Sequence, residues 1–505
     1  MRDARRPPAA ALIALGKGAI VAAGLAVLLA GLPAGPEPVR AASNVPGGNA
    51  GLAVRSVHYH TRARLQGDIE AFREFRPSYP FWRHIFTIPD GRIIFGRADD
   101  GRLLATFPTR GNWGRDGVWA EPALEGMLSG RRLPRGLRDR RREVEELLEA
   151  RVGEVVHNAT RGRFLEPHAA RHGDFLREWG DIYERFGVPA EIGLAQAVVE
   201  SGLNGRARSQ VRALGFCQWM PRNWNHLKRL SPYVIEGYNQ TTQAPFCAAY
   251  LSILATMYGS FIPALSEHHA GGVNVGRTVI NGERLGGRGT REQYLQGSDF
   301  ARALRQISIR RYRQLFRTYG PRSALYAEMV FGNTYNVRRL MEETPQSRIF
   351  AMRVTRNTPL SEVTRATGLS TREVKRYNPA LVRQVPRRAN LYLPEYLEEF
   401  GSDVSFWHRP PSAGYAAALN DFVKLDATVE EWHEDTFKET LGAFRQRFAD
   451  TGTEEGTVMA TALAYVIGEL STSRRGAILE EFRNSDRIRR LFERGRRELA
   501  ERAGS

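Results

Sequence analysis

The residues best placed to do chemistry lie in one stretch, ESGLNGRARSQVRALGFCQWMP, which runs from Glu200 to Pro221. Glu200 closes an apolar run in which Ile192, Ala195 and Val199 share one helical face. A carboxyl on the last turn of such a helix is partly desolvated, and desolvation raises its pKa and favours the protonated form near neutral pH. The stretch therefore predicts a general acid, although a surface glutamate at a helix end would show the same spacing.

The positions after Glu200 hold small, polar and glycine residues at fixed intervals, namely Ser201, Ala207, Ser209, Ala213, Gly215, Gln218, Met220 and Pro221. This order resembles the signature of the soluble lytic transglycosylase family, relatives of goose-type lysozyme, with Arg212 where the family usually has glycine. The resemblance implies a lysozyme-like, all-helical catalytic domain over residues 170–345, with a groove for glycan strands and Glu200 as its single acid/base.

The reaction that the resemblance implies needs one carboxyl and no cofactor. Glycosidases that use water normally carry two carboxyls. In the family, one glutamate protonates the leaving oxygen and then accepts the proton of the sugar 6-hydroxyl, which leaves a 1,6-anhydro-muramic end. By the same resemblance, Gln218 and the backbone around Phe216 and Trp219 line the sugar groove. Ser201 would orient the carboxyl or the neighbouring backbone, and a plain helix-terminal serine is the alternative.

Two histidines stand where the family's third signature, A-Y-N-A-G, places its substrate contacts. The aligned residues are Glu267, His268, His269, Ala270 and Gly271, so His268 replaces the tyrosine and His269 the asparagine. An imidazole can still hydrogen-bond a sugar or the carboxyl, and its titration near neutrality would change the pH dependence. A metal site on the paired histidines is disfavoured because adjacent helical residues point apart, so no metal is expected.

Glu267 and Tyr294 are further candidates, each with a plain alternative. If Glu267 faced Glu200 across the groove, a two-carboxylate hydrolase of lysozyme type would become possible, and a solvated helix residue is the favoured interpretation. Tyr294, in TREQYLQ, lies where the family often carries a late groove tyrosine. It is therefore a candidate substrate-binding residue, with a core or surface tyrosine as the alternative.

Cys217 and Cys247 are the only cysteines of the chain. In an oxidising compartment two cysteines can form one disulfide, and two buried free thiols are the alternative. No Cys/His/Asn set at a familiar spacing accompanies them, so thiol catalysis is not expected.

The N-terminus has the layout of a secretory signal peptide. A basic head holds Arg2, Arg5 and Arg6, an apolar run spans residues 18–32, and a small-residue cleavage site ends at Ala41. The run is short for a bilayer span, which needs roughly 20 apolar residues; an uncleaved anchor, and with it membrane association, is the alternative. Export places the protein in the periplasm or cell envelope. The net charge of +18 then favours an anionic cell wall over nucleic acid as partner.

Residues 350–394 predict a strand, two helices and a returning strand. The expected elements are a strand at Met352–Val354, a helix between Thr358 as N-cap and Gly368, a helix capped by Ser370, and a strand at Leu391–Leu393. This order, with Asn378 near its centre, resembles a LysM module, which binds glycans that contain N-acetylglucosamine. Asn357 and Thr358 replace the family's glycine and aspartate, and a folding module that binds nothing is the alternative.

The domain boundaries combine composition and periodicity with what the two resemblances imply. Residues 1–42 are the signal peptide, 43–169 a linker and N-terminal α/β region, 170–345 the catalytic domain, 346–400 the LysM-like module and 401–505 a helical C-terminal region. Within the second part, residues 42–67 are expected to be a linker and 84–107 a small β-meander, and a helix begins near Asp139 and runs through Val155.

The sequence thus predicts a mainly α-helical, exported lytic transglycosylase that cleaves the MurNAc-GlcNAc β-1,4 bond of peptidoglycan glycan strands. Its architecture would be similar to that of membrane-bound lytic transglycosylase D with a LysM module. A non-catalytic wall-binding scaffold is the alternative that the two histidines favour, and a hydrolytic lysozyme depends on Glu267.

Overall fold

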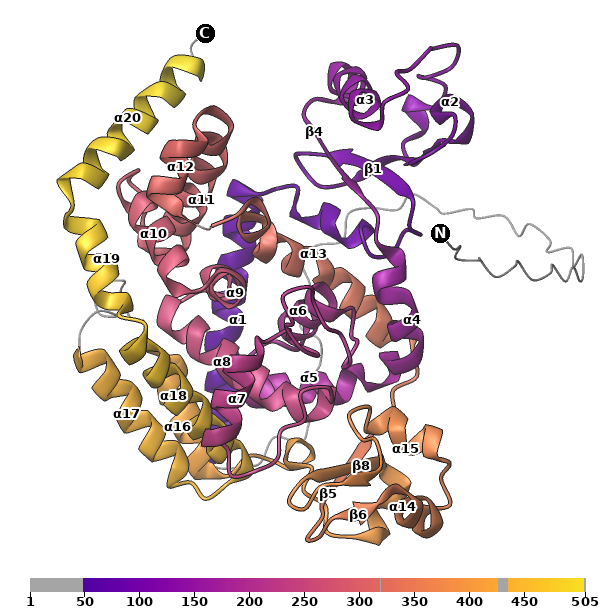
Figure 1. Cartoon of the computed structure of the whole chain (residues 1–505), viewed down its shortest axis with the longest axis vertical. Helices are drawn as coiled ribbons and strands as arrows, with labels where there is room; N and C mark the ends of the chain where they lie inside the picture. Colours follow the sequence, from indigo (N-terminus) through magenta and orange to yellow (C-terminus); the bar gives the residue numbers. More distant parts are fainter. Residues whose placement is uncertain (1–48, 318, 426–434, 504–505) are drawn as a thin grey trace, which may run out of the picture. The chain divides into compact units, whose positions relative to one another are not determined.

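The computed structural model describes residues 49–317, 319–425 and 435–503 (Figure 1). Helices dominate, as predicted for a mainly α protein, and the described strands form one four-stranded and two two-stranded sheets. The predicted signal peptide lies outside the described residues. Among the helices of the described ranges, none has both the length and the apolar composition needed to cross a bilayer.

The first described element is a long helix, α1 (Asn49–Phe75), where the sequence predicted a linker. Its buried face carries Val57, Thr61, Arg64, Leu65, Asp68 and Phe72 at helical spacing. Asp68 accepts hydrogen bonds from the Ser260 hydroxyl at 2.6 Å and from the Phe261 backbone at 2.7 Å. The chain is helical from residue 49 onwards, so the prediction of a linker is wrong for these residues. The sequence pattern does not reveal this helix because polar side chains interrupt the apolar stripe of its buried face.

A small antiparallel sheet follows, with strand order β3-β2-β1-β4. Its strands are β1 (Arg92–Arg97), β2 (Leu103–Pro108), β3 (Val118–Trp119) and β4 (Val155–Ala159), and α2 (Trp113–Asp116) and α3 (Leu137–Val152) contribute to its core. Gly101, at φ +70°, lies in the turn between β1 and β2. The predicted meander is confirmed from Arg92 onwards. Residues 85–91 form turns and bends instead of a strand, and Val155 belongs to β4 rather than to the preceding helix.

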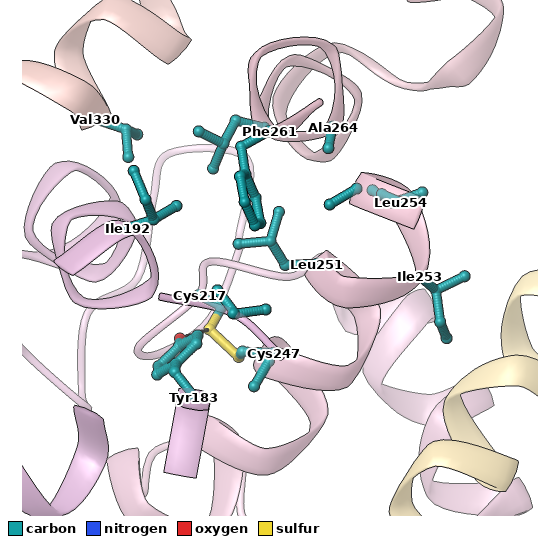
Figure 2. Packing of buried hydrophobic residues seen from close by; sticks show 14 of the residues in the cluster. Tyr183, Ile192, Cys217, Cys247, Leu251, Ile253, Leu254, Phe261, Ala264 and Val330 are labelled. Carbon is teal, nitrogen blue, oxygen red and sulfur yellow. Dashed lines mark hydrogen bonds between the residues drawn. A yellow bond between two sulfur atoms is a disulfide. The ribbon is translucent and has the colours of Figure 1, made fainter. Parts of the chain in front are cut away.

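The largest hydrophobic core is helical and surrounds the segment that bears Glu200. Its main helices are α5 (Leu176–Arg185), α6 (Ala190–Ser201), α8 (Gln240–Tyr258), α9 (Phe261–Ala270), α10 (Gly272–Glu283), α11 (Gly289–Ile307) and α13 (Pro321–Glu343), with the shorter α4 (Gly162–His172), α7 (Pro221–Leu230) and α12 (Ile309–Phe316). Figure 2 shows Ile192 of α6, Leu251 of α8 and Phe261 of α9 packed close together.

Helix α6 is buried on nearly all sides, which is typical of a helix in the centre of a large core. Gly193 allows α5 to approach it, because a Cβ at this position would lie 2.1 Å from the Tyr183 ring. Each fully buried apolar side chain of such a helix contributes about 1.5–3 kcal/mol. The packing therefore fixes the end of α6, where Glu200 lies.

Residues 349–394 have the predicted strand–helix–helix–strand order. The elements are β5 (Ile349–Arg353), β6 (Thr358–Pro359), α14 (Leu360–Thr367), α15 (Thr371–Tyr377), β7 (Gln384–Val385) and β8 (Asn390–Pro394), with β5 paired to β8 and β6 to β7, both antiparallel. Gly368 ends α14 in the left-handed conformation, and Ser370 caps α15 in a capping box with Glu373. Thr358 is not the N-cap of α14, because the helix begins at Leu360 and the N-cap position therefore falls on Pro359.

The C-terminal region is helical, as expected, and joins the core of α6 and α8. Its helices are α16 (Ala413–Val423), α17 (Asp435–Ala449), α18 (Glu454–Thr472), α19 (Arg475–Asn484) and α20 (Asp486–Ala503). Met459, Leu463 and Leu479 belong to the same hydrophobic cluster as Ile192. Figure 1 shows α19 and α20 beside α10 and α12. This region therefore contributes to the core that positions Glu200.

Candidate active site

Glu200 lies on the last turn of α6, and Gly202, at φ +58°, ends the helix in the left-handed conformation. The Glu200 side chain is 13% exposed. Burial raises the pKa of its carboxyl to about 7. Roughly half of the Glu200 carboxyls are therefore protonated at neutral pH, and the protonated form is the one that a general acid needs.

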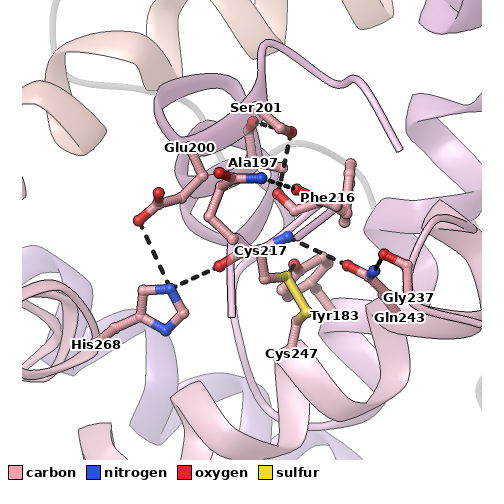
Figure 3. Close-up of a disulfide and its surroundings, with 12 residues drawn as sticks. Tyr183, Ala197, Glu200, Ser201, Phe216, Cys217, Gly237, Gln243, Cys247 and His268 are labelled. Carbon is pink, nitrogen blue, oxygen red and sulfur yellow. Dashed lines mark hydrogen bonds and ion pairs between the residues drawn. A yellow bond between two sulfur atoms is a disulfide. The ribbon is translucent and has the colours of Figure 1, made fainter. Parts of the chain in front are cut away.

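Two side chains approach the Glu200 carboxyl from other helices. The Tyr326 hydroxyl, from α13, donates a hydrogen bond to Oε1 at 2.5 Å, and His268 Nε2, from α9, lies 3.6 Å from the same oxygen. Figure 3 shows His268 between the carboxyl and the Cys217 carbonyl. Burial raises the pKa of Glu200 more than the hydrogen bond from Tyr326 lowers it.

His268 is neutral at physiological pH. Burial lowers the pKa of its imidazole to about 4. Its Nε2 lies 2.9 Å from the Cys217 carbonyl oxygen, and because a carbonyl oxygen only accepts, we assign the proton to Nε2. The Nε2–H is thus donated to the Cys217 carbonyl, and the neutral ring brings no full positive charge to Glu200, 3.6 Å away, so the carboxyl keeps its raised pKa.

His269 contacts Tyr326 instead of the Cys217 carbonyl. Its ring stacks on Tyr326, with centroids 4.7 Å apart and an angle of 7° between the planes. His269 is exposed, whereas Tyr326 is buried. The adjacent histidines therefore act on different neighbours of Glu200, His268 on the Cys217 carbonyl and His269 on the tyrosine. Within the described ranges, no group of three or more His, Cys, Asp or Glu side chains is arranged to hold a metal ion.

Ser201 and Gln218 hold the loop that follows α6. The buried Ser201 hydroxyl lies 3.0 Å from the Ala197 carbonyl and 3.1 Å from the Phe216 carbonyl, so it connects α6 to the loop backbone. Gln218 adopts φ +51° and donates from Nε2 to the Gly215 carbonyl at 2.8 Å. Of the two expected roles for Ser201, the contact with the neighbouring backbone fits this geometry.

A disulfide joins Cys217 of the loop to Cys247 of α8 (Figure 3). The two residues are 30 positions apart, and closing a loop of this length stabilises a fold by about 3–4 kcal/mol in the chain-entropy account. The Cys217 backbone N–H also donates to Gln243 Oε1 at 3.4 Å. The disulfide therefore restrains the residue whose carbonyl orients His268.

Glu267 is buried and paired, and it is not the solvated helix residue that the sequence favoured. Arg475 of α19 donates from Nη1 to Glu267 Oε1 at 2.7 Å, and the Tyr258 hydroxyl donates to Oε2. Arg475 Nη2 also donates to the Tyr258 hydroxyl at 2.8 Å. A Cβ on Gly272 would lie 2.3 Å from Arg475 Nη1, so a larger residue there would displace the guanidinium from Glu267. Both carboxyl oxygens of Glu267 are engaged in this cluster.

Tyr294 is 1% exposed. Its hydroxyl lies 2.6 Å from the Ser266 hydroxyl and 2.7 Å from that of Tyr319, which is also buried. A ring without exposed surface cannot contact a glycan strand, so this geometry fits the alternative of a core tyrosine. Of the proposed substrate-binding residues, Tyr294 and Ser201 both lie in the interior.

A raised pKa by itself does not single out Glu200. Burial also raises the pKa of Glu236 to about 7, beside Thr242, and that of Glu184 to about 7, next to Arg62. Glu200 differs from these carboxyls in its surroundings, since it contacts Tyr326 and His268 at the end of α6. Glu236 is therefore a useful control, because it is a buried carboxyl with the same raised pKa elsewhere in the fold.

Two residues of the site escaped the sequence reasoning. Tyr326 contacts Glu200 across 126 positions of sequence, and a tyrosine inside an apolar helix has the same local pattern as any core tyrosine. Arg475 lies in a region rich in Arg/Glu pairs, where nothing local separates a buried arginine from a solvated one. Only the three-dimensional structure brings these side chains to α6 and α9.

The comparisons with known proteins agree with this part of the fold. Residues 178–287 match the family model described as Transglycosylase SLT domain, a range that includes Glu200, Gln218, His268 and His269. The resemblance drawn from the sequence is confirmed over this range, and the match supports lytic transglycosylase activity on peptidoglycan. No curated protein matches the chain at a significant level.

Proposed function

We propose that the protein is an exported peptidoglycan lytic transglycosylase in which Glu200 is the single acid and base. It would cleave the β-1,4 bond between MurNAc and GlcNAc and leave a 1,6-anhydro-MurNAc end. The observation that carries the proposal is the Glu200 carboxyl, which is buried, has a pKa of about 7 and lies within the range matched to the Transglycosylase SLT domain. Its place of action would be the periplasm or cell envelope.

The proposed reaction returns Glu200 to its starting state without consuming water. Protonated Glu200 gives its proton to the glycosidic oxygen as the bond from that oxygen to the sugar C1 breaks. The 6-hydroxyl oxygen of the same sugar then forms a bond to C1, and its proton passes to the ionised carboxyl. Between the two steps the Tyr326 hydroxyl, 2.5 Å away, stabilises the carboxylate.

A second carboxyl is not needed for this route, and the surroundings of Glu267 argue against a hydrolytic one. In a retaining or inverting glycosidase the second carboxyl must be free to attack C1 or to activate water. Glu267 is instead held by Arg475 and Tyr258. The hydrolytic lysozyme is therefore the less favoured alternative.

For substrate binding we propose different roles for the candidate residues. His269 is exposed and stacked on Tyr326, so it is the best candidate to touch the glycan. His268 would pack beside Glu200 as a neutral ring held by the Cys217 carbonyl, and Ser201 and Gln218 would hold the groove loop through their backbone contacts. Tyr294 would act only from within the core.

We further propose that residues 346–400 are a glycan-binding LysM-like module, in an architecture similar to that of membrane-bound lytic transglycosylase D. The strand–helix–helix–strand order supports this proposal. So does Asn378, which is buried and joins the end of α15 to β8 by accepting from the Tyr392 N–H at 2.9 Å and donating to its carbonyl at 2.6 Å. The other proposed parts are residues 1–42 as signal peptide, 43–169 as N-terminal α/β region, 170–345 as catalytic domain and 401–505 as helical C-terminal region.

Digestion of purified sacculi, followed by mass spectrometry of the released muropeptides, tests the proposal. The full chain should release anhydro-muropeptides, and Glu200→Gln should release them at least about a hundredfold more slowly, while Glu236→Gln serves as a matched control that retains activity. Products with reducing ends would indicate the hydrolytic lysozyme. Sacculi that bind the protein but stay intact would indicate a non-catalytic scaffold, the alternative that the two histidines favour.

A further inference from the structure

A cavity of about 430 Å³ lies between α10, α12, α19 and α20, and its lining is strongly basic. Four arginines line it, Arg277, Arg313, Arg317 and Arg487, against a single carboxylate, Glu481. The wall therefore carries an excess of three positive charges. The volume falls within the range of small-molecule sites, which is about 300–1,000 Å³.

Arg277 is the buried member of this set. It is 5% exposed, and its Nε and Nη1 atoms are buried without a hydrogen-bond partner among the described residues. Its guanidinium lies over the Phe482 ring, 5.0 Å from the centroid. Burial lowers the pKa of Arg277 and the nearby Arg317 lowers it further, whereas Glu481 raises it only in part. A guanidinium in this situation is unfavourable unless an anion compensates its charge.

Most of the remaining wall is apolar, with Gln314 and Ser485 as its polar members. Phe482 and Ile478 of α19 and Ile488 and Leu491 of α20 contribute to it. An inorganic ion would make no apolar contact with these side chains. A ligand with an anionic group and an apolar body would use both parts of the wall.

We propose that this cavity binds an organic phosphate monoester, with the phosphate on Arg277 and the organic part against Phe482 and Leu491. A phosphate monoester carries a charge of about −1.5 to −2 and three acceptor oxygens, so it compensates a wall with three excess positive charges better than a carboxylate does. Planar guanidinium groups bind phosphate through paired N–H donors. The site is separate from Glu200, so the proposal does not depend on the proposed function.

Calorimetric titration of the full chain with hexyl phosphate tests the proposal, with inorganic phosphate and hexanol as matched probes. Hexyl phosphate should bind more tightly than inorganic phosphate, and hexanol should not bind. Flotation with phosphatidylcholine vesicles, with and without phosphatidic acid, then separates the two sources of such a ligand: binding only with phosphatidic acid indicates a lipid, and none indicates a soluble ester. Absence of hexyl phosphate binding would overturn the proposal.

Three variants assign the binding to this cavity. Arg277→Met should weaken hexyl phosphate binding by about tenfold or more. Arg313→Gln should weaken it less, and Arg310→Gln, which removes an exposed arginine of the same helix outside the lining, should leave it unchanged. Equal binding by Arg277→Met and the unmodified chain would overturn the proposal.

Thermal unfolding without ligand separates a binding role of Arg277 from a structural one. If the charge of Arg277 awaits an anion, Arg277→Met removes an uncompensated buried charge and the Tm stays equal or rises. Hexyl phosphate should then raise the Tm of the unmodified chain but not that of the variant. A large fall in Tm on substitution, with no effect of hexyl phosphate on the unmodified chain, would show a structural arginine instead.

Discussion

Two buried carboxyls of the helical core, Glu200 on α6 and Glu267 on α9, differ in whether a cation lies beside them, and this difference sets the role of each. Their side chains are 13% and 9% exposed. Glu200 contacts a phenol and a neutral imidazole, so nothing compensates the ionised form fully and its pKa rises to about 7. Glu267 pairs with the Arg475 guanidinium at 2.7 Å. The first carboxyl can exchange a proton near neutral pH, whereas the second holds α9 to the C-terminal region.

Replacing each carboxyl by an amide tests this difference, and the largest effect on activity is expected at Glu200. Glu200→Gln keeps the shape of the side chain but removes the exchangeable proton, so release of muropeptides should fall by about 10²- to 10⁴-fold. Glu236→Gln, which removes a buried carboxyl of the same raised pKa, should stay near the unmodified rate. Equal losses in both variants would mean that the effect is structural.

The next largest effect is expected when the cation is taken from Glu267. Arg475→Met leaves a buried carboxylate without its partner, and breaking a buried pair in this way costs roughly 3–5 kcal/mol. Urea unfolding should record this loss, and the double variant Glu267→Gln/Arg475→Met should recover most of it because no buried charge remains. A single variant within about 1 kcal/mol of the unmodified chain would contradict the role given to Arg475.

The stability of the unmodified chain should fall relative to Glu200→Gln as the pH rises. The folded-state pKa of Glu200, about 7, lies above the ordinary value of 4.5, so between these values the folded state binds more protons than the unfolded state. The variant should match the unmodified chain near pH 4 and be more stable by roughly 3 kcal/mol near pH 8. The other buried carboxyls contribute equally to both proteins, so their contribution cancels in the difference between the two free energies of unfolding. A difference that is constant with pH would contradict the raised pKa.

The smallest effect is expected at Tyr326. Its hydroxyl favours the ionised form of Glu200, and Tyr326→Phe removes this hydrogen bond, so the pKa of Glu200 should rise further. The alkaline limb of the pH–rate profile should then move to higher pH, even if the rate falls because the carboxyl is less well held. A limb that stays in place or moves to lower pH would show that Tyr326 does not act on the carboxyl.

Local sequence patterns predict the helix that bears Glu200. They do not predict the buried helix α1 or the side chains that surround the carboxyl. The apolar run before Glu200 and the glycine after it predict α6 and its end, because helix periodicity and a left-handed stop are local properties. Helix α1 was missed because Thr61, Arg64 and Asp68 lie on its buried face. Their partners are distant in sequence, so no local pattern could show that burial of these polar groups is compensated.

The site itself shows the same limit. Glu200 could be proposed from its spacing, but its state depends on Tyr326 and His268, which come from two other helices. The sequence favours a solvated Glu267 because a glutamate on a helix usually is solvated, and its partner Arg475 is 208 positions away. Tyr294 was a candidate by alignment, and its burial against Ser266 and Tyr319 becomes visible only in the packed core.

The central claim is that Glu200 is a carboxyl held half protonated near neutral pH by burial without a cation. Infrared difference spectroscopy of the full chain against Glu200→Gln, followed across pH, measures the titration of this one carboxyl directly. We expect a midpoint near pH 7. A midpoint near the ordinary value of 4.5 would contradict it.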